Sequence, residues 1–93
     1  MISRTNASFR KLFDRLPSDV KRQARQAYRL FLQDPSHPGL RFKPIHPRDP
    51  IYSVRVGLHY RAVGVKTRDE IIWFWVGTHA DYDHLLKQWS RKA

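Results

Sequence analysis

An unbroken run of branched and aromatic residues near the end of the chain most constrains how it folds. Residues 71–76 leave no polar position on either face, which is typical of a strand inside a sheet. Thr78 and Asp81 have the spacing of a helix N-terminal capping box. An apolar stripe at helical spacing follows: Tyr82, Leu85, Leu86 and Trp89. The sequence therefore predicts a strand that passes directly into a helix, with His79 at about the first helical position.

Two further helices are predicted in the first third of the chain. One apolar stripe at helical spacing consists of Phe9, Leu12, Phe13 and Leu16. A second consists of Val20, Ala24, Ala27, Tyr28 and Phe31. Pro17 interrupts the pattern between them, and Asp34-Pro35 ends it. We expect two antiparallel helices at about residues 6–15 and 18–33.

From Leu40 onward the apolar period changes towards two, which is typical of strands. Leu40 and Phe42 alternate with polar residues, and so do Tyr52, Val54 and Val56. Three or four strands should follow one another before the last short helix. With no internal repeat or linker, residues 1–93 are predicted to form one α+β domain.

The charge of the chain is strongly positive, at +10 from 18 basic and 8 acidic residues. A chain this basic usually meets nucleic acid or an acidic protein, although a solvated basic surface without a partner is the alternative. The absence of cysteine excludes disulfides and thiolate metal sites, and the five histidines lack metal-ligand spacing, so we expect neither a metal nor a cofactor. No signal peptide or membrane-spanning run is recognisable, and a cytoplasmic location is expected.

A histidine at a strand–helix junction, in a chain this basic, suggests chemistry on a polyanion, of which RNA is one. Metal-free cleavage needs a base for the 2′-hydroxyl, cations for the developing phosphorane charge and an acid for the leaving oxygen. His79 is the candidate base or acid, because a neutral imidazole accepts a proton near pH 7. Arg55 and Arg61 are candidates for bidentate phosphate contacts. The structural alternatives are a histidine that only decorates a helix end and arginines in surface ion pairs.

The two arginines act together only if the hairpin between them has the right connection. A two-residue turn would place them on opposite faces, whereas an odd-numbered connection at 57–59 places them on the same face. We predict the odd connection. It collects the more apolar residues on the other, helix-covered face: Tyr52, Val54, Val56, Tyr60 and Ala62.

Other candidates have stronger structural alternatives. Tyr82 belongs to the apolar stripe of the last helix, so core packing competes with a catalytic role. His84 faces away from that stripe and is a weaker candidate for a phosphate contact. Arg41 and Lys43 alternate on a strand and are candidates for contacts with RNA or the ribosome, with a solvated edge as the alternative. Trp73 and Trp75 lie in a central strand, where we expect core packing rather than base stacking.

Three segments in this order give the chain a family resemblance. They are the helix break at Leu16-Pro17, the hairpin IYSVRVGLHYRAVGV and the closing strand, turn and helix VGTHADYDHLL. Together they resemble the RelE/ParE superfamily of bacterial toxins from type II toxin–antitoxin systems. The resemblance implies two N-terminal antiparallel helices packed on a twisted three- to four-stranded antiparallel sheet, a short C-terminal helix, and a basic concave site on the other face. The last segment is most similar to members whose histidine at this turn takes part in RNA cleavage.

The chain also departs from that family. Many members begin with a full strand, whereas here only residues 2–4 are available, so we expect a vestigial edge strand. Some ribosome-dependent members carry lysines in the first hairpin strand, where this chain has Tyr52, Ser53 and Arg55. These differences favour a site centred on histidine.

The resemblance, together with the candidate residues, leads to a specific functional hypothesis. We predict a toxin that cleaves mRNA without a metal, in a ribosome-dependent reaction that leaves a cyclic phosphate, and that is bound by a cognate antitoxin. The alternative is a ParE-like inhibitor of DNA gyrase without catalysis, and a third possibility is a non-toxic basic adaptor. Convergence of His79, Arg55 and Arg61 within about 10 Å would favour the nuclease.

Overall fold

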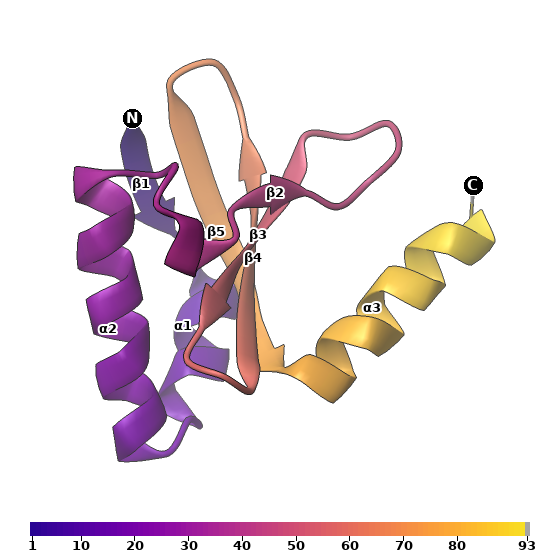
Figure 1. Ribbon diagram of the computed structural model, residues 1–93. Helices are drawn as coiled ribbons and strands as arrows, with labels where there is room; N and C mark the ends of the chain where they lie inside the picture. Colours follow the sequence, from indigo (N-terminus) through magenta and orange to yellow (C-terminus); the bar gives the residue numbers. More distant parts are fainter. Residues whose placement is uncertain (93) are drawn as a thin grey trace.

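A five-stranded sheet divides the molecule, with helices α1 and α2 on one side and helix α3 on the other (Figure 1). The computed structural model describes the backbone of residues 1–92 and the side chains of residues 1–89. In chain order the elements are β1 (Ile2–Thr5), α1 (Ala7–Asp14), α2 (Ser18–Gln33), a 3-10 turn (Pro38–Leu40), β2 (Lys43–Pro44), β3 (Ile51–Val56), β4 (Tyr60–Lys66), β5 (Glu70–Thr78) and α3 (His79–Lys92). The α+β class, the two N-terminal helices and the C-terminal helix are confirmed.

The sheet is larger than predicted and mixed. Its strand order is β1-β5-β4-β3-β2, with β1 parallel to β5 and the other pairs antiparallel. The prediction of three or four antiparallel strands therefore differs in detail, because the sheet has five strands and the short edge strand β1 pairs in parallel. Ile2 donates its N–H to the Asp69 carbonyl, and the indole of Trp73 donates to the Ser3 hydroxyl at 2.9 Å. These long-range contacts order a four-residue strand whose own sequence gives little strand signal.

The β3–β4 hairpin has the predicted odd connection. Val56 pairs with Tyr60, which leaves the three residues 57–59 as the loop, and Gly57 takes a positive φ of 60°. Arg55 and Arg61 are therefore direct cross-strand partners on one face. The apolar residues Val54, Val56 and Ala62 pack in the core on the α1 and α2 side.

A bulge in strand β5 separates two tryptophans that the sequence places two positions apart. Val63 pairs with Trp75 and Gly64 with Trp73, so one residue of β5 is unpaired. Trp73 is 3% exposed and lies in the core, as predicted. Trp75 instead packs beside Tyr82 of α3, with its ring centroid 6.5 Å from the tyrosine ring, and is partly exposed. The expectation of core packing for both tryptophans is correct only for Trp73.

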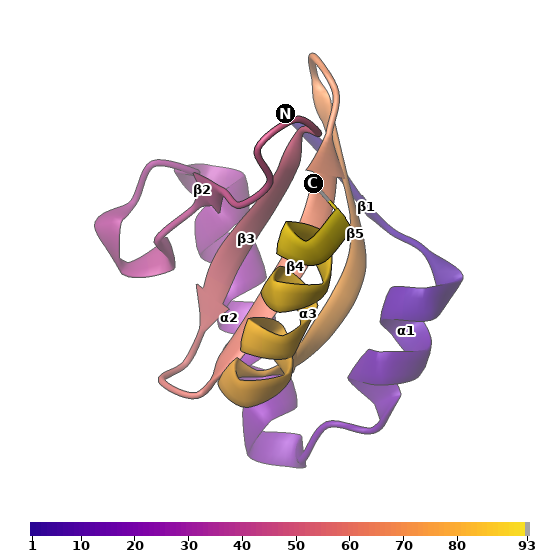
Figure 2. The same cartoon turned by 90° about the vertical axis from the view of Figure 1, so that its right-hand side faces the viewer.

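Helix α3 lies across the face of the sheet opposite α1 and α2 (Figure 2). Its first residue is His79, and the Thr78 hydroxyl accepts the Asp81 N–H at 3.1 Å, as the capping pattern predicted. Further along, Trp89 packs edge-on against His46 in the β2–β3 loop. Within residues 1–92, no helix has the length and apolar character needed to span a membrane.

Candidate functional site

Strand register alone aligns the main candidates on the α3 face. Arg55 pairs with Arg61, and Arg61 pairs with Gly77 on β5, two residues before His79. Directly opposed residues in an antiparallel pair have Cβ atoms about 5 Å apart and share a face. The sheet therefore places both arginines in one row that leads to the start of α3.

His79 is oriented by groups on both sides. Its Nδ1 lies 3.2 Å from the Asp83 carboxylate one helical turn later, and its backbone N–H donates to the His59 carbonyl at 2.7 Å. The imidazole also packs edge-on against Tyr82, with ring centroids 5.9 Å apart. Because the side chain is 49% exposed and Asp83 engages Nδ1, Nε2 is the nitrogen available to a ligand.

Arg61 is the most perturbed cation of the site. Partial burial lowers the pKa of its guanidinium below the usual value, and the charges of Arg55 and Arg41 lower it further, whereas Tyr82 and Asp83 raise it. One guanidinium N–H donates to the Tyr60 carbonyl at 2.9 Å. Two guanidinium groups thus repel that of Arg61 at this surface, and a bound anion would relieve that repulsion.

Arg55 reaches towards the edge of the sheet rather than directly towards His79. Its Nε donates to the Gly57 carbonyl at 3.0 Å. The side chain also lines a cavity of about 240 Å³ with Gln23 and Gln26 of helix α2. Its charge still acts on Arg61, so it contributes to the positive potential of the site.

Tyr82 occupies a buried position beside the site. The residue is 5% exposed, and its hydroxyl lies 3.0 Å from the hydroxyl of Ser53, which is 1% exposed. The ring contacts both His79 and Trp75. This hydrogen bond ties the first turn of α3 to strand β3.

The remaining candidates lie around the cluster. Arg41 follows the 3-10 turn in a left-handed conformation with φ of 49°, uncommon for a non-glycine residue, and its charge acts on Arg61. Lys43 is exposed on β2 opposite Ser53, and His84 is exposed on α3. Across the described side chains, no three His, Cys, Asp or Glu residues gather in a way that would hold a metal ion.

Two residues that were not among the site candidates orient the site. Asp83 follows His79 at helical i,i+4 spacing, so its charge near the imidazole can be anticipated from the sequence. Ser53 gave no comparable signal, because its partner Tyr82 is 29 positions away in the sequence.

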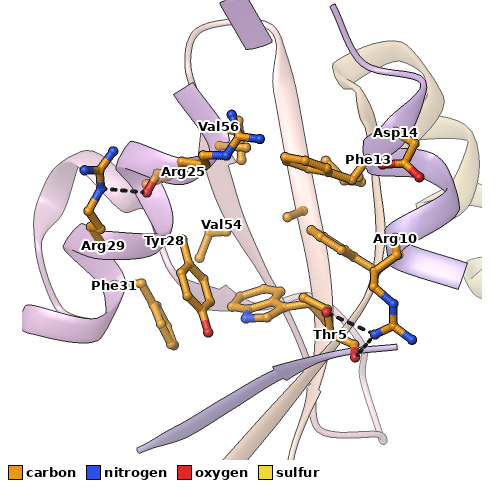
Figure 3. Close-up of a pocket in the computed structure, with 16 residues that line it drawn as sticks. Thr5, Arg10, Phe13, Asp14, Arg25, Tyr28, Arg29, Phe31, Val54 and Val56 are labelled. Atoms are coloured by element: carbon orange, nitrogen blue, oxygen red, sulfur yellow. Dashed lines mark hydrogen bonds between the residues drawn. The ribbon is translucent and has the colours of Figure 1, made fainter. Parts of the chain in front are cut away.

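The opposite face of the sheet carries a large apolar groove between α1 and α2, with a volume of about 820 Å³ (Figure 3). Its walls are mostly aromatic and aliphatic: Phe9, Phe13, Ala24, Ala27, Tyr28, Phe31, Val54, Val56, Ala62, Trp73 and Val76. Arg10, Arg25 and Arg29 lie on its rim, with Asp14 as the acidic residue. Arg10 is tethered to the Thr5 carbonyl at 2.7 Å and Arg29 to the Arg25 carbonyl at 3.5 Å. The groove is thus an apolar surface bordered by positive charge.

One family model matches this chain, and several solved structures share its fold. The model of the ParE-like toxin domain matches residues 18–84. Among solved structures, the RelB–RelE antitoxin–toxin complex of Methanococcus jannaschii matches with a TM-score of 0.69 and 22% identity over 86% of this chain and 95% of that one. The archaeal RelE–RelB complex of Pyrococcus horikoshii matches with a TM-score of 0.66 and 13% identity over 83% and 92% of the two chains. A copper-bound mutant toxin from Helicobacter pylori matches with a TM-score of 0.61 and 18% identity over 87% of this chain and 97% of that one. No curated protein sequence matches.

Proposed function

The chain belongs to the ParE-like toxin family, and from this premise we propose that it is a toxin that cleaves mRNA and is neutralised by a cognate antitoxin. The observation that carries the nuclease proposal is the charge cluster on the α3 face. The charges of Arg41 and Arg55 act on Arg61, on the same face as a histidine whose Nδ1 is already engaged by a carboxylate. An RNA phosphodiester with its neighbouring 2′-hydroxyl matches this arrangement, because the phosphate brings negative charge to the arginines and the hydroxyl brings a proton for the histidine.

In the proposed reaction, His79 Nε2 takes the proton of the RNA 2′-hydroxyl. The 2′-oxygen attacks the adjacent phosphorus, and the bond from phosphorus to the 5′-oxygen breaks. The products are a 2′,3′-cyclic phosphate and a 5′-hydroxyl, whose proton comes from water or from the protonated histidine. The arginine cluster stabilises the extra negative charge of the phosphorane. The reaction needs no metal and no cofactor.

We assign Tyr82 to positioning rather than to proton transfer. Its hydroxyl is buried and bound to Ser53, whereas its ring contacts the imidazole of His79. Asp83 has a similar role, because its contact with Nδ1 leaves Nε2 for the substrate. Arg41, Lys43 and His84 are assigned to RNA contacts around the site, since all three are exposed.

The ribosome is proposed as the second half of the site. Arg55 and Arg61 each donate a hydrogen bond to a backbone carbonyl, and His79 is half exposed. Such an open site orients a flexible RNA backbone poorly, and in-line attack depends strongly on orientation. A translating ribosome would hold the mRNA in an extended path across this face.

The groove between α1 and α2 is proposed to bind an acidic, amphipathic segment of the antitoxin. Its apolar walls suit the apolar side of such a segment, and the arginines on its rim suit the acidic side. Two of the similar solved structures are antitoxin–toxin complexes, which supports a partner of this kind.

A ParE-like inhibitor of gyrase is the second candidate. It is favoured by the direction of Arg55, which is held at the sheet edge by the Gly57 carbonyl beside α2 rather than next to His79. An inhibitor that only binds has no need for convergent catalytic groups. The same fold is compatible with either function.

The decisive experiment maps mRNA cleavage on translating ribosomes by primer extension. Wild type is compared with His79→Ala and with His37→Ala, a control histidine that is exposed just before the 3-10 turn and has no assigned role in the site. We expect cleavage by wild type and by the control, and a loss of about 100-fold or more in His79→Ala with an unchanged melting temperature. Absence of cleavage by wild type, together with inhibition of gyrase supercoiling, would replace the nuclease by the gyrase inhibitor.

A further inference from the structure

Trp75 is a large aromatic side chain on the candidate catalytic face rather than in the core. The single-residue bulge opposite Val63 and Gly64 reverses the facing of β5 between Trp73 and Trp75. Bulges next to active sites commonly re-aim a side chain in this way. The indole remains partly exposed, beside the ring of Tyr82.

Gly77 makes room for this indole. A Cβ atom at position 77 would lie 2.7 and 2.8 Å from two carbons of the six-membered ring of Trp75, closer than real Cβ contacts allow. The indole therefore lies directly over the backbone of Gly77. Gly77 is also the cross-strand partner of Arg61, so the aromatic ring and the most perturbed cation of the site are neighbours on one face.

We propose that Trp75 is a stacking platform for one nucleobase of single-stranded RNA, with the adjoining phosphate on Arg61. The identification of the ligand as RNA rests on the proposed function. Two residues along a strand span about 7 Å, so the indole and the row of Arg61 and Gly77 lie within the reach of one nucleotide. Stacking accepts every base, because each has a π-face, and it holds the nucleotide before cleavage.

A purely structural role for Trp75 predicts different behaviour. If the indole only supports Tyr82 and α3, removing it lowers the stability of the fold. The resulting loss of RNA affinity would then be the same for every RNA. A platform makes the effect depend on one base. The experiment therefore removes the base as well as the side chain.

The probe is a fluorescently labelled single-stranded 2′-O-methyl oligonucleotide, which cannot be cleaved, in low salt. Binding is measured by anisotropy for the full chain and for Trp75→Leu, Trp75→Phe and Trp89→Phe. Trp89 is the matched control, because it contacts His46 at the far end of α3. We expect Trp75→Leu to weaken binding about 5- to 100-fold, Trp75→Phe to weaken it less, and the control to bind as wild type. Melting temperatures identify any variant that fails to fold.

The same probe is then prepared with an abasic residue at each position in turn. We expect one position at which base removal weakens binding to wild type and abolishes the difference between wild type and Trp75→Leu. The first half of this scan measures only binding to the wild-type chain, so it still tests for a base-dependent position when a variant unfolds. Equal binding at all abasic positions, or an unchanged affinity in a folded Trp75→Leu variant, would overturn the platform.

Failure of the platform and failure of the nuclease give separate results. Base-dependent binding through Trp75 without ribosomal cleavage retains the platform and removes the nuclease. Cleavage that depends on His79 but not on Trp75, with equal binding at every abasic position, retains the nuclease and removes the platform.

Discussion

The two faces of the sheet use the same strands but have opposite chemistry. On the α1 and α2 face, Val54, Val56 and Ala62 line an apolar groove whose charges lie only on the rim. On the α3 face, neighbouring positions of these strands carry Arg55, Arg61 and the buried Ser53. Strand alternation explains this segregation, and the odd hairpin loop keeps both arginines on one side. A very small domain can thus present the proposed partner surface and the proposed reaction surface back to back.

The two faces also differ in the kind of unfavourable exposure or charge that the folded protein carries on each. On the α1 and α2 face, the groove leaves apolar side chains uncovered. On the α3 face, burial and neighbouring arginines lower the pKa of Arg61, so the folded protein holds a cation at a cost before any ligand arrives. The α1 and α2 face therefore leaves apolar area uncovered, whereas the α3 face holds a positive charge that its surroundings disfavour.

The largest effect is expected from Arg61→Ala. Loss of a cation that stabilises transition-state charge should reduce mRNA cleavage about 100- to 1000-fold. Arg61→Lys should restore little of this, because an ammonium lacks the bidentate geometry. Since the lowered pKa means that folding disfavours the charged form, the melting temperature of Arg61→Ala should not fall through loss of charge. Cleavage rates on translating ribosomes test the loss of activity, and thermal unfolding tests the melting temperature.

Arg68→Ala is the matched control, because Arg68 is exposed in the turn between β4 and β5, away from the site. It should cleave like wild type. An equal loss in both variants would mean that total positive charge, rather than the α3 face, determines activity.

Reversing the rim charge tests the other face. Arg25→Glu combined with Arg29→Glu should weaken antitoxin binding about tenfold or more, mainly through slower association, and leave cleavage unchanged. Arg22→Glu on the same helix is the control, since Arg22 is exposed and does not line the groove. Calorimetry or surface plasmon resonance measures the affinity. A loss of cleavage in the double variant would show that the two faces are not independent.

Much of the candidate site on the α3 face followed from local rules in the sequence. Thr78 and Asp81 predicted where α3 begins, and so where His79 lies. The apolar set of the hairpin predicted the odd loop, and with it the pairing of Arg55 and Arg61. These features depend on residues close in sequence or on simple alternation, which a sequence displays directly.

The features that escaped prediction depend on long-range pairing. A bulge changes the register by one residue and turns Trp75 to the opposite face, and no local signal in β5 marks it. Gly64 gives an indirect signal, because a Cβ there would lie 2.9 Å from the ring of Trp73. Strand β1 likewise gains its order from β5 rather than from its own residues.

The contact between Tyr82 and Ser53 should affect stability more than chemistry. Tyr82→Phe leaves the buried Ser53 hydroxyl without its partner, at a cost of about 1 kcal/mol, and Ser53→Ala should have a similar effect. The double variant should lose less than the sum of the two, since the shared hydrogen bond is removed only once. Chemical denaturation measures all four proteins. Additive losses would show that the two hydroxyls do not interact, and α3 would then be held by apolar contacts alone.

The smallest effect is expected from Asp83→Asn. The contact with His79 Nδ1 is 3.2 Å long but about half exposed on both sides, and exposed ion pairs contribute less than about 1 kcal/mol. Because an asparagine oxygen still accepts a hydrogen bond from Nδ1, cleavage should fall less than about fivefold. Asp81→Asn is the control, because Asp81 is also exposed on the first turn, and its hydrogen bond to Thr78 is made by its backbone N–H. A loss in Asp83→Asn as large as that in His79→Ala would mean that the carboxylate itself takes part in proton transfer, and the reaction face would then be built on an acid–base pair rather than on one histidine.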